Sequence, residues 1–160
     1  MLRRPDYDRW HGDVLTHLSR TYLHDLAAEL LAMGAAVAGF KLGEMGVYLR
    51  AGDADVLRRL LRLPIAIDDW ANVEVYQPAF QVEVVGTTGA GDSAYAGLLA
   101  AMRRGMSPAE SLRMACAAGA HNVEAFDSNS GIRHWEDIQA RIGAGWPSYP
   151  TALPTTDAAV

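Results

Sequence analysis

The sequence predicts an α/β fold, because short apolar runs of strand length alternate with segments that show helical periodicity. Apolar runs occur at residues 35–40, 47–50 and 79–85, and apolar residues recur at helical spacing over 93–104 and 107–123. The chain has 160 residues, of which half are hydrophobic and 21% are charged. This size and composition suit a single domain with a substantial core.

The composition excludes several classes of protein. A formal net charge of -5 gives no basic footprint, so nucleic acid is not an expected partner. Cys116 is the one cysteine, which excludes an internal disulfide framework and a four-cysteine zinc site. The histidines have no metal-ligand spacing, so we expect no metal site made by side chains. No apolar run approaches the roughly 20 residues that span a bilayer, and the first residues lack the apolar core of a signal peptide. We therefore expect a cytoplasmic protein with no membrane partner.

The first third of the chain predicts a helix followed by a β-hairpin. Apolar residues form one stripe over residues 14–31, and the hydroxyl residues at 19–21 allow a break at which a second helix is capped. Gly34 is placed to end this helical segment. Residues 35–50 then read as a buried strand, a tight glycine turn and a second strand.

Residues 53–78 have the least regular pattern. A short helix is expected over 56–63, ended by Pro64. The aromatic residues that follow indicate an ordered loop, which leads into the strand expected at 79–85.

Two helices follow the next glycine-rich turn. The first is expected over 93–104 and ends at Gly105. The second runs from 107 to 123 and opens with a capping box, in which Ser107 is the N-cap residue and Glu110 occupies the third helical position. The small residues of this helix predict close packing against a flat surface such as a sheet face.

The last part of the chain is expected to be a polar loop over 126–131 and a helix over 135–142. Glycine, proline, serine and threonine then dominate. This composition predicts a disordered tail over 143–160.

The glycine-rich turn is the strongest functional signal. Gly86, Gly89 and Gly91 follow an apolar run and precede a helix, so the backbone can turn with its amides exposed. The amides of Ala90, Gly91 and Asp92 would then face an anion at the helix N-terminus. Asp92 places a carboxylate beside that anion.

Two well-known phosphate-binding motifs do not match this turn. The glycine spacing differs from the G-x-G-x-x-G of the dinucleotide-binding fold. Gly86 and Gly91 have P-loop spacing, and Ser93 stands at the serine or threonine position, but Asp92 stands where a P-loop has lysine. The turn therefore combines an anion cradle with a base that could take the proton of an attacking hydroxyl, as phosphoryl transfer requires. An aspartate in the first helical turn also stabilises the helix by itself. Asp92 alone therefore does not distinguish a catalytic base from an acid that only stabilises the helix end.

The segment Gly86-Thr-Thr-Gly-Ala-Gly-Asp92 resembles the second signature of the ribokinase-like (PfkB) carbohydrate kinases, D-T-T/V-G-A-G-D. Lys41-Leu-Gly-x-x-Gly46 is similar to the family's K-x-G-x-x-G turn. The resemblance covers roughly residues 20–142. It implies a three-layer α/β/α sandwich, of which this chain would be the C-terminal portion, with residues 1–142 as the nucleotide-binding and phosphate-binding part.

The resemblance also implies a function and site residues. The chain would belong to an ATP-dependent kinase that phosphorylates a hydroxyl of a small carbohydrate or nucleoside. Asp92 would be the catalytic base, and the amides of Gly89, Ala90 and Gly91 would form the anion hole for the transferred phosphate. Mg²⁺ would arrive bound to ATP. The residues expected to bind the nucleotide are Lys41, Gly43, Gly46, Thr88, Cys116 and Asn122.

Simpler roles stay open for three of these residues. Lys41 ends a buried strand, where a lysine head is usually solvated. Asn122 lies near a helix end and could be a cap. Cys116 lies on the packed side of its helix and could be a small core residue.

The chain departs from the family pattern in two ways. Gly86 replaces the leading aspartate of the signature, which in some members helps to hold a monovalent cation, so such a site is not expected here. Family members are also about twice as long. Their N-terminal half carries the sugar pocket, the lid and an N-x-x-E element associated with magnesium, and this element is absent from the chain. We therefore expect a partner, either the missing N-terminal half or a second copy. The alternative is an incomplete fragment that acts only as a nucleotide-binding or interaction module.

Overall fold

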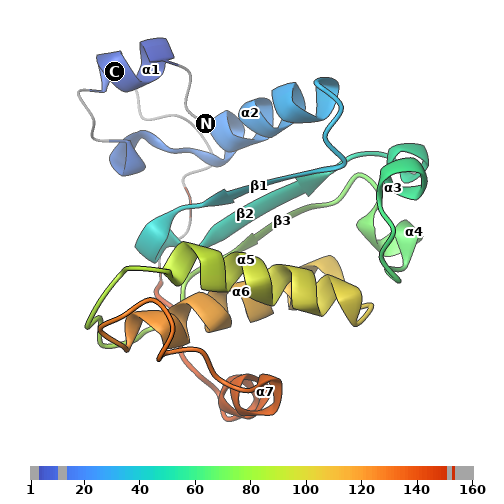
Figure 1. Ribbon diagram of the computed structural model, residues 1–160. Coiled ribbons are helices and arrows are strands. Elements are labelled where there is room, and N and C mark those ends of the chain that lie inside the picture. Colours follow the sequence, from blue (N-terminus) through green and yellow to red (C-terminus); the bar gives the residue numbers. More distant parts are fainter. Residues whose placement is uncertain (1–3, 11–13, 151–152, 154–160) are drawn as a thin grey trace.

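The computed structural model describes residues 4–10, 14–150 and 153. A three-stranded antiparallel sheet with strand order β1-β2-β3 forms its middle layer, from β1 (Val37–Lys41), β2 (Val47–Ala51) and β3 (Glu74–Gln77). Helix α2 (Arg20–Ala32) covers one face, and α5 (Ala90–Arg103) and α6 (Pro108–Val123) lie on the other (Figure 1). These layers confirm the predicted α/β class and the three-layer sandwich. The remaining helices are α1 (Arg4–Arg9), α3 (Ala54–Leu60), α4 (Ile67–Trp70) and α7 (Trp135–Gly143), with 3-10 turns at Leu15–His17 and Gly43–Met45.

Each face of the sheet buries its own core. Tyr48 and Leu23 are the largest fully buried side chains between the sheet and α2. Leu49, Trp70 and Leu112 lie in the larger core on the α6 side. Successive residues of β2 thus enter opposite cores, as the period of two in a strand requires. Within the described residues, no helix is long and apolar enough to cross a membrane.

The predicted helix boundaries are confirmed where a cap was visible in the sequence. The break expected at 19–21 is present, because the side chain of Ser19 accepts a 3.0 Å hydrogen bond from the amide of Tyr22 and begins α2 there. Gly34 follows α2 with a φ of 101°, a left-handed conformation that suits glycine. The capping box of α6 is complete, since Ser107 and Glu110 each accept a hydrogen bond from the other's amide.

The strand expected over 79–85 is wrong. The third strand is β3, which ends just before Pro78, and Phe80 alone forms an isolated bridge, with Ser148. Pro78 has no amide hydrogen with which to continue the ladder. The alternating apolar residues Val82 and Val84 line a cavity instead of facing a sheet.

The tail also differs from its predicted disorder over residues 144–150. Trp146 is buried, and its Nε1 donates a 2.8 Å hydrogen bond to the carbonyl oxygen of Gln81. The amide of Tyr149 donates to the carbonyl oxygen of Ala79 at 2.9 Å. Long-range contacts therefore order this segment, although its composition is typical of disorder. Residues 151–152 and 154–160, which belong to the same prediction, lie outside the described residues.

A half-buried ion pair at the end of α6 holds α7 against it. Arg141 donates to both carboxylate oxygens of Glu124, at 2.6 and 2.8 Å, and these bonds lower the pKa of Glu124. The guanidinium also lies 3.6 Å from the ring centroid of Trp146. Burial and the nearby Arg141 charge lower the pKa of His121, so this ring is neutral in the folded protein at pH 7.

Helices α5 and α6 pack at a distance that only very small residues permit. A Cβ built on Gly97 of α5 would lie 2.8 Å from Cβ of Ala118 and 2.9 Å from the carbonyl oxygen of Met114 on α6. A Cβ on Gly119 of α6 would lie 3.3 Å from Cβ of Ala94. The small residues of α6 thus serve helix packing as well as the predicted packing on the sheet, because α6 also contacts β2 and β3.

The glycine turn is fixed to the C-terminal end of α6. The amides of Val85 and Gly86 both donate to the carbonyl oxygen of Val123, at 2.8 and 3.1 Å. Asn122 is completely buried, and its Nδ2 donates a 2.9 Å hydrogen bond to the carbonyl oxygen of Thr88. Two adjacent residues at the end of α6 thus hold the turn that precedes α5.

Replacing Gly97 by alanine is expected to destabilise the chain. The added methyl group would overlap backbone atoms of α6, and such overpacking costs about 1–3 kcal/mol. The matched control is Gly143→Ala at the last residue of α7, where an added Cβ meets nothing within 4 Å. Denaturant unfolding should show a loss of stability for Gly97→Ala and little change for the control. Equal effects would contradict the tight packing of α5 on α6.

Replacing Asn122 by leucine is expected to loosen the glycine turn, because leucine has similar bulk but no amide to donate to Thr88. Loss of this bond costs about 1 kcal/mol of unfolding free energy. In the variant, hydrogen exchange should become faster at the amides of residues 85–89, whereas exchange in the middle of α6 should change less. Asn129→Ala in the exposed 126–131 loop is the control and should leave this exchange unchanged. If Asn122→Leu also left it unchanged, the backbone bonds alone would hold the turn.

Candidate active site

The N-terminus of α5 forms the base of the site. Gly89 is its N-cap residue and has a φ of 80°, so the chain enters the helix through a left-handed conformation. The first-turn amides, including those of Gly91 and Asp92, have no acceptor within the helix and point along its axis. The amide of Ala90 makes a long 3.3 Å bond to the carbonyl oxygen of Thr87. This end of the helix carries partial positive charge and suits an anion.

Lys41 brings a full positive charge to the same place. It ends β1, and its ammonium lies so close to Gly91 that a Cβ on that glycine would overlap it. An ammonium beside a helix N-terminus is electrostatically unfavourable unless an anion lies between them. This end of the cavity would therefore suit an anion, although Lys41 is exposed and its charge is also accessible to solvent.

Asp92 lies beside this cradle, in the first turn of α5. Its side chain is exposed, and it makes no hydrogen bond or ion pair with the residues that the structure describes. The carboxylate is thus available to accept a proton from a molecule that reaches the cradle. An acid at this position also stabilises the helix end, so the geometry is compatible with both interpretations of Asp92.

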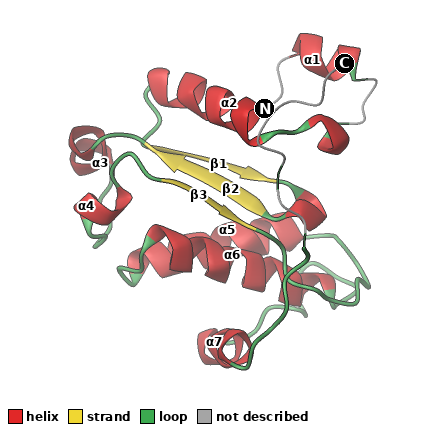
Figure 2. Cartoon of the chain, turned by 180° about the vertical axis from the view of Figure 1, so that it is seen from behind, coloured by secondary structure: helices red, strands yellow, loops and turns green. Residues whose placement is uncertain are grey.

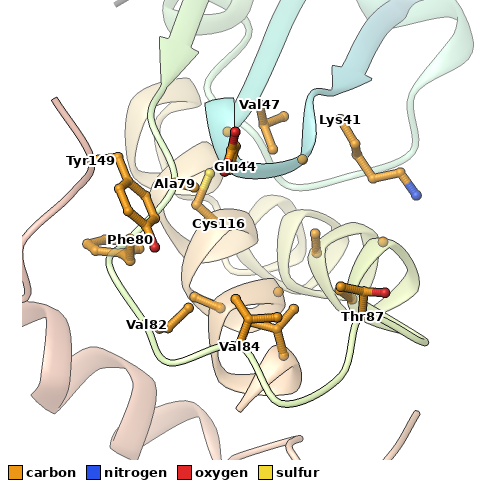
Figure 3. A pocket seen from close by; sticks show the side chains of 18 of the residues that line it. Lys41, Glu44, Val47, Ala79, Phe80, Val82, Val84, Thr87, Cys116 and Tyr149 are labelled. Carbon is orange, nitrogen blue, oxygen red and sulfur yellow. The ribbon is translucent and has the colours of Figure 1, made fainter. Parts of the chain in front are cut away.

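A cavity of about 630 Å³ opens from the cradle, a volume within the usual range for small-molecule sites. Figure 3 shows its walls, which come from the 41–47 turn, the 79–87 segment and helices α5 and α6. Lys41, Thr87 and Gly91 lie at its charged end. Most of the remaining surface is apolar.

The structure brings most of the expected nucleotide-binding residues together at this cavity. Lys41, Gly43, Gly46 and Cys116 line it, as do Ala90 and Gly91 of the expected anion hole. Gly89 and Asp92 adjoin it through the first turn of α5. Thr88 and Asn122 do not line it: Thr88 accepts the Asn122 hydrogen bond through its carbonyl oxygen, and Asn122 lies under the turn. Asn122 is therefore placed to position the turn.

Cys116 forms part of the wall as a neutral thiol. Burial raises its pKa to about 12, and its Sγ donates a 3.5 Å hydrogen bond to the carbonyl oxygen of Gln77. Its core role and its place at the cavity are thus compatible. A thiol in this state is not a nucleophile.

Several cavity residues were missed in the sequence. Phe80, Val82 and Val84 reach the cavity from an irregular segment, and their alternation was the signal that was assigned to a strand. Tyr149 reaches it from the C-terminal segment. No local signal identified Tyr149, because its position depends on contacts with residues about 70 positions earlier in the chain.

No metal-binding cluster of three or more histidine, cysteine, aspartate or glutamate residues is present among the described side chains. The position of the leading aspartate in the resembled signature is also closed. A Cβ on Gly86 would lie 2.8 Å from the carbonyl oxygens of both Ala125 and Phe126. The residues present therefore do not fit a monovalent cation held by a carboxylate at this position.

Solved structures with a similar fold are kinases. Ribokinase from Thermotoga maritima is 26% identical, with a TM-score of 0.59, and the match covers 74% of this chain and 34% of that chain. Aminoimidazole riboside kinase from Salmonella enterica, in complex with aminoimidazole riboside and an ATP analog, is 24% identical with a TM-score of 0.53 and coverages of 73% and 35%. Phosphofructokinase-2 from Escherichia coli, in complex with potassium, is 17% identical with a TM-score of 0.57 and coverages of 79% and 35%. The latter two show the fold alone. The chain spans about a third of the length of these structures.

A search of the curated proteins found no match. The family model of the pfkB family carbohydrate kinases matches residues 16–135, and this range contains both the 41–46 turn and the complete glycine turn. Because the match extends over well more than half of the chain, the chain belongs to the pfkB family of carbohydrate kinases.

Proposed function

We propose that the chain supplies the phosphate-binding and nucleotide-binding part of an ATP-dependent sugar or nucleoside kinase. The observation that carries this proposal is the convergence of Lys41 and the α5 N-terminus at one end of a largely apolar cavity. A nucleoside triphosphate has the matching polarity, with a charged phosphate chain and an aromatic base. Membership of the pfkB family and the relatives described as kinases of sugars and ribosides support the same conclusion.

In the proposed reaction, Asp92 accepts the proton of the acceptor hydroxyl as its oxygen attacks the γ-phosphorus of ATP. The new P–O bond forms while the bond from phosphorus to the bridging oxygen of ADP breaks, and ADP leaves with that electron pair. The amides of Gly89, Ala90 and Gly91 stabilise the charge on the transferred phosphoryl group, and Lys41 adds a full positive charge. Mg²⁺ bound to ATP would neutralise further phosphate charge.

A second candidate function is a nucleotide-binding module that lacks transfer activity until a partner docks. In the described part of the chain, β1 pairs only with β2, so its other edge is open. Tyr95 and Leu99 lie one helical turn apart on α5 and are 56% and 47% exposed. An open edge beside an apolar helix face suits added strands that extend the sheet and cover α5. The occupant that we propose is the N-terminal half of a kinase of this family, since the chain spans a third of its solved relatives.

The Asp92→Asn variant tests the proposed kinase. ATP affinity measured by calorimetry should change by less than about twofold, since the amides and Lys41 remain. ADP release with a panel of sugars and nucleosides should fall by about 10²–10⁴-fold, as expected for loss of a general base. The control is Asp68→Asn, an exposed acid on the short helix α4. A chain that binds no ATP would overturn the proposed function, and unchanged turnover in Asp92→Asn would overturn the base assignment.

The double variant Tyr95→Glu, Leu99→Glu tests the docking surface. If the isolated chain binds ATP without releasing ADP, mixing it with a separately produced N-terminal half of a family kinase should yield a complex in sedimentation velocity. The double variant should abolish this complex but keep ATP affinity. Ala109→Glu, on the exposed start of α6, is the control. Complex formation by the double variant, or turnover by a monomeric wild-type chain, would exclude this candidate.

A further inference from the structure

The two ends of the cavity differ in chemistry. Lys41 and Thr87 lie on one side of the view in Figure 3, and Tyr149 and Phe80 lie on the other. The first end holds the ammonium of Lys41, whereas the second presents aromatic rings, and the carboxylate of Glu44 lies between them in this view. If the phosphates of a nucleotide occupy the first end, as the proposed function requires, its base lies toward the second. The aromatic end is therefore the part of the cavity that can distinguish a nucleotide from inorganic phosphate chains.

The C-terminal segment reaches this end through a short antiparallel pairing. The amide of Tyr149 donates to the carbonyl oxygen of Ala79 at 2.9 Å, and the amide of Gln81 donates to the carbonyl oxygen of Pro147 at 2.8 Å. The side chain of Gln81 adds a 3.0 Å bond to the carbonyl oxygen of Ser148. Hydrogen bonds at Tyr149 and at the two residues before it thus fix the position of Tyr149.

Trp146 anchors the same segment. Its ring stacks on Phe80 with centroids 4.6 Å apart and an interplanar angle of 24°. The guanidinium of Arg141 covers the indole ring, and Nε1 of Trp146 donates to the carbonyl oxygen of Gln81. Tyr149 therefore follows a rigid anchor by three residues, so little conformational freedom remains to be lost when a ligand contacts it.

We propose that Tyr149 contacts the nucleotide base, so that a residue beyond helix α7 determines nucleotide affinity. This inference rests on the proposed function. Tyr149 is half-buried at the cavity wall, and its ring offers a flat apolar surface on which a purine can stack. Stacking contributes to binding of the base but not to binding of the phosphates. Loss of the Tyr149 ring should therefore lower the affinity only for ligands that carry a base.

The experiment compares ATP with inorganic tripolyphosphate on the full 160-residue chain. Calorimetry should show that Tyr149→Ala weakens ATP binding by about 5- to 100-fold, the range expected for loss of one base–aromatic stack. Tripolyphosphate affinity should change by less than twofold. Tyr149→Phe keeps the ring and should retain ATP affinity within about threefold. The matched control is Tyr95→Ala, since Tyr95 is exposed on α5 and does not line the cavity.

Two results would overturn the inference while leaving the proposed function intact. One is an unchanged ATP affinity in Tyr149→Ala. The other is an equal loss for ATP and tripolyphosphate, which would place Tyr149 at the phosphates or assign it a general structural role. A wild-type chain that binds neither ligand would instead overturn the proposed function and this inference with it. Should Tyr149→Ala unfold, Tyr149→Leu keeps apolar bulk without an aromatic ring and gives the same comparison.

Discussion

The close contact between α5 and α6 is the constraint on which the site depends. Gly97 and Gly119 let the two helix backbones approach, and this approach determines where the first turn of α5 lies. The end of α6 then holds the glycine turn that precedes α5, through Val123 and Asn122. The position of the proposed anion cradle is therefore a consequence of helix packing, with the glycine-rich turn as the connection that this packing requires. A methyl group in the helix interface would shift the cradle even though no site residue had changed.

Two positive groups meet at the N-terminus of α5. The helix end and the ammonium of Lys41 are both positive, and the chain brings them together although they repel each other. The arrangement is most stable when a negative group lies between them. Asp92 stands outside this pair, where it can interact with a neutral hydroxyl that approaches the anion. In the proposed function, charge thus separates the part of the site that would hold a phosphate from the part that would activate its acceptor.

Local signals in the sequence predicted what depends on local interactions. The caps at Ser19 and Ser107 are side-chain bonds to amides three residues away, and both are present in the structure. The glycine turn was also predicted from the sequence, because its glycines permit the left-handed conformation that Gly89 adopts, although contacts with α6 hold it in place. The strand expected over 79–85 was wrong, since alternation reports which residues are buried but not what buries them. The place of Tyr149 could not be predicted, because distant backbone partners determine it.

Gly86 carries a consequence for how this sequence can change. The carbonyl oxygens of Ala125 and Phe126 occupy the space that any side chain at position 86 would need. An aspartate at this position, as in the resembled signature, could be accommodated only if the backbone of residues 125–126 moved as well. An aspartate at position 86 therefore requires a compensating change in the backbone that packs against it. Position 86 and residues 125–126 can thus change only together.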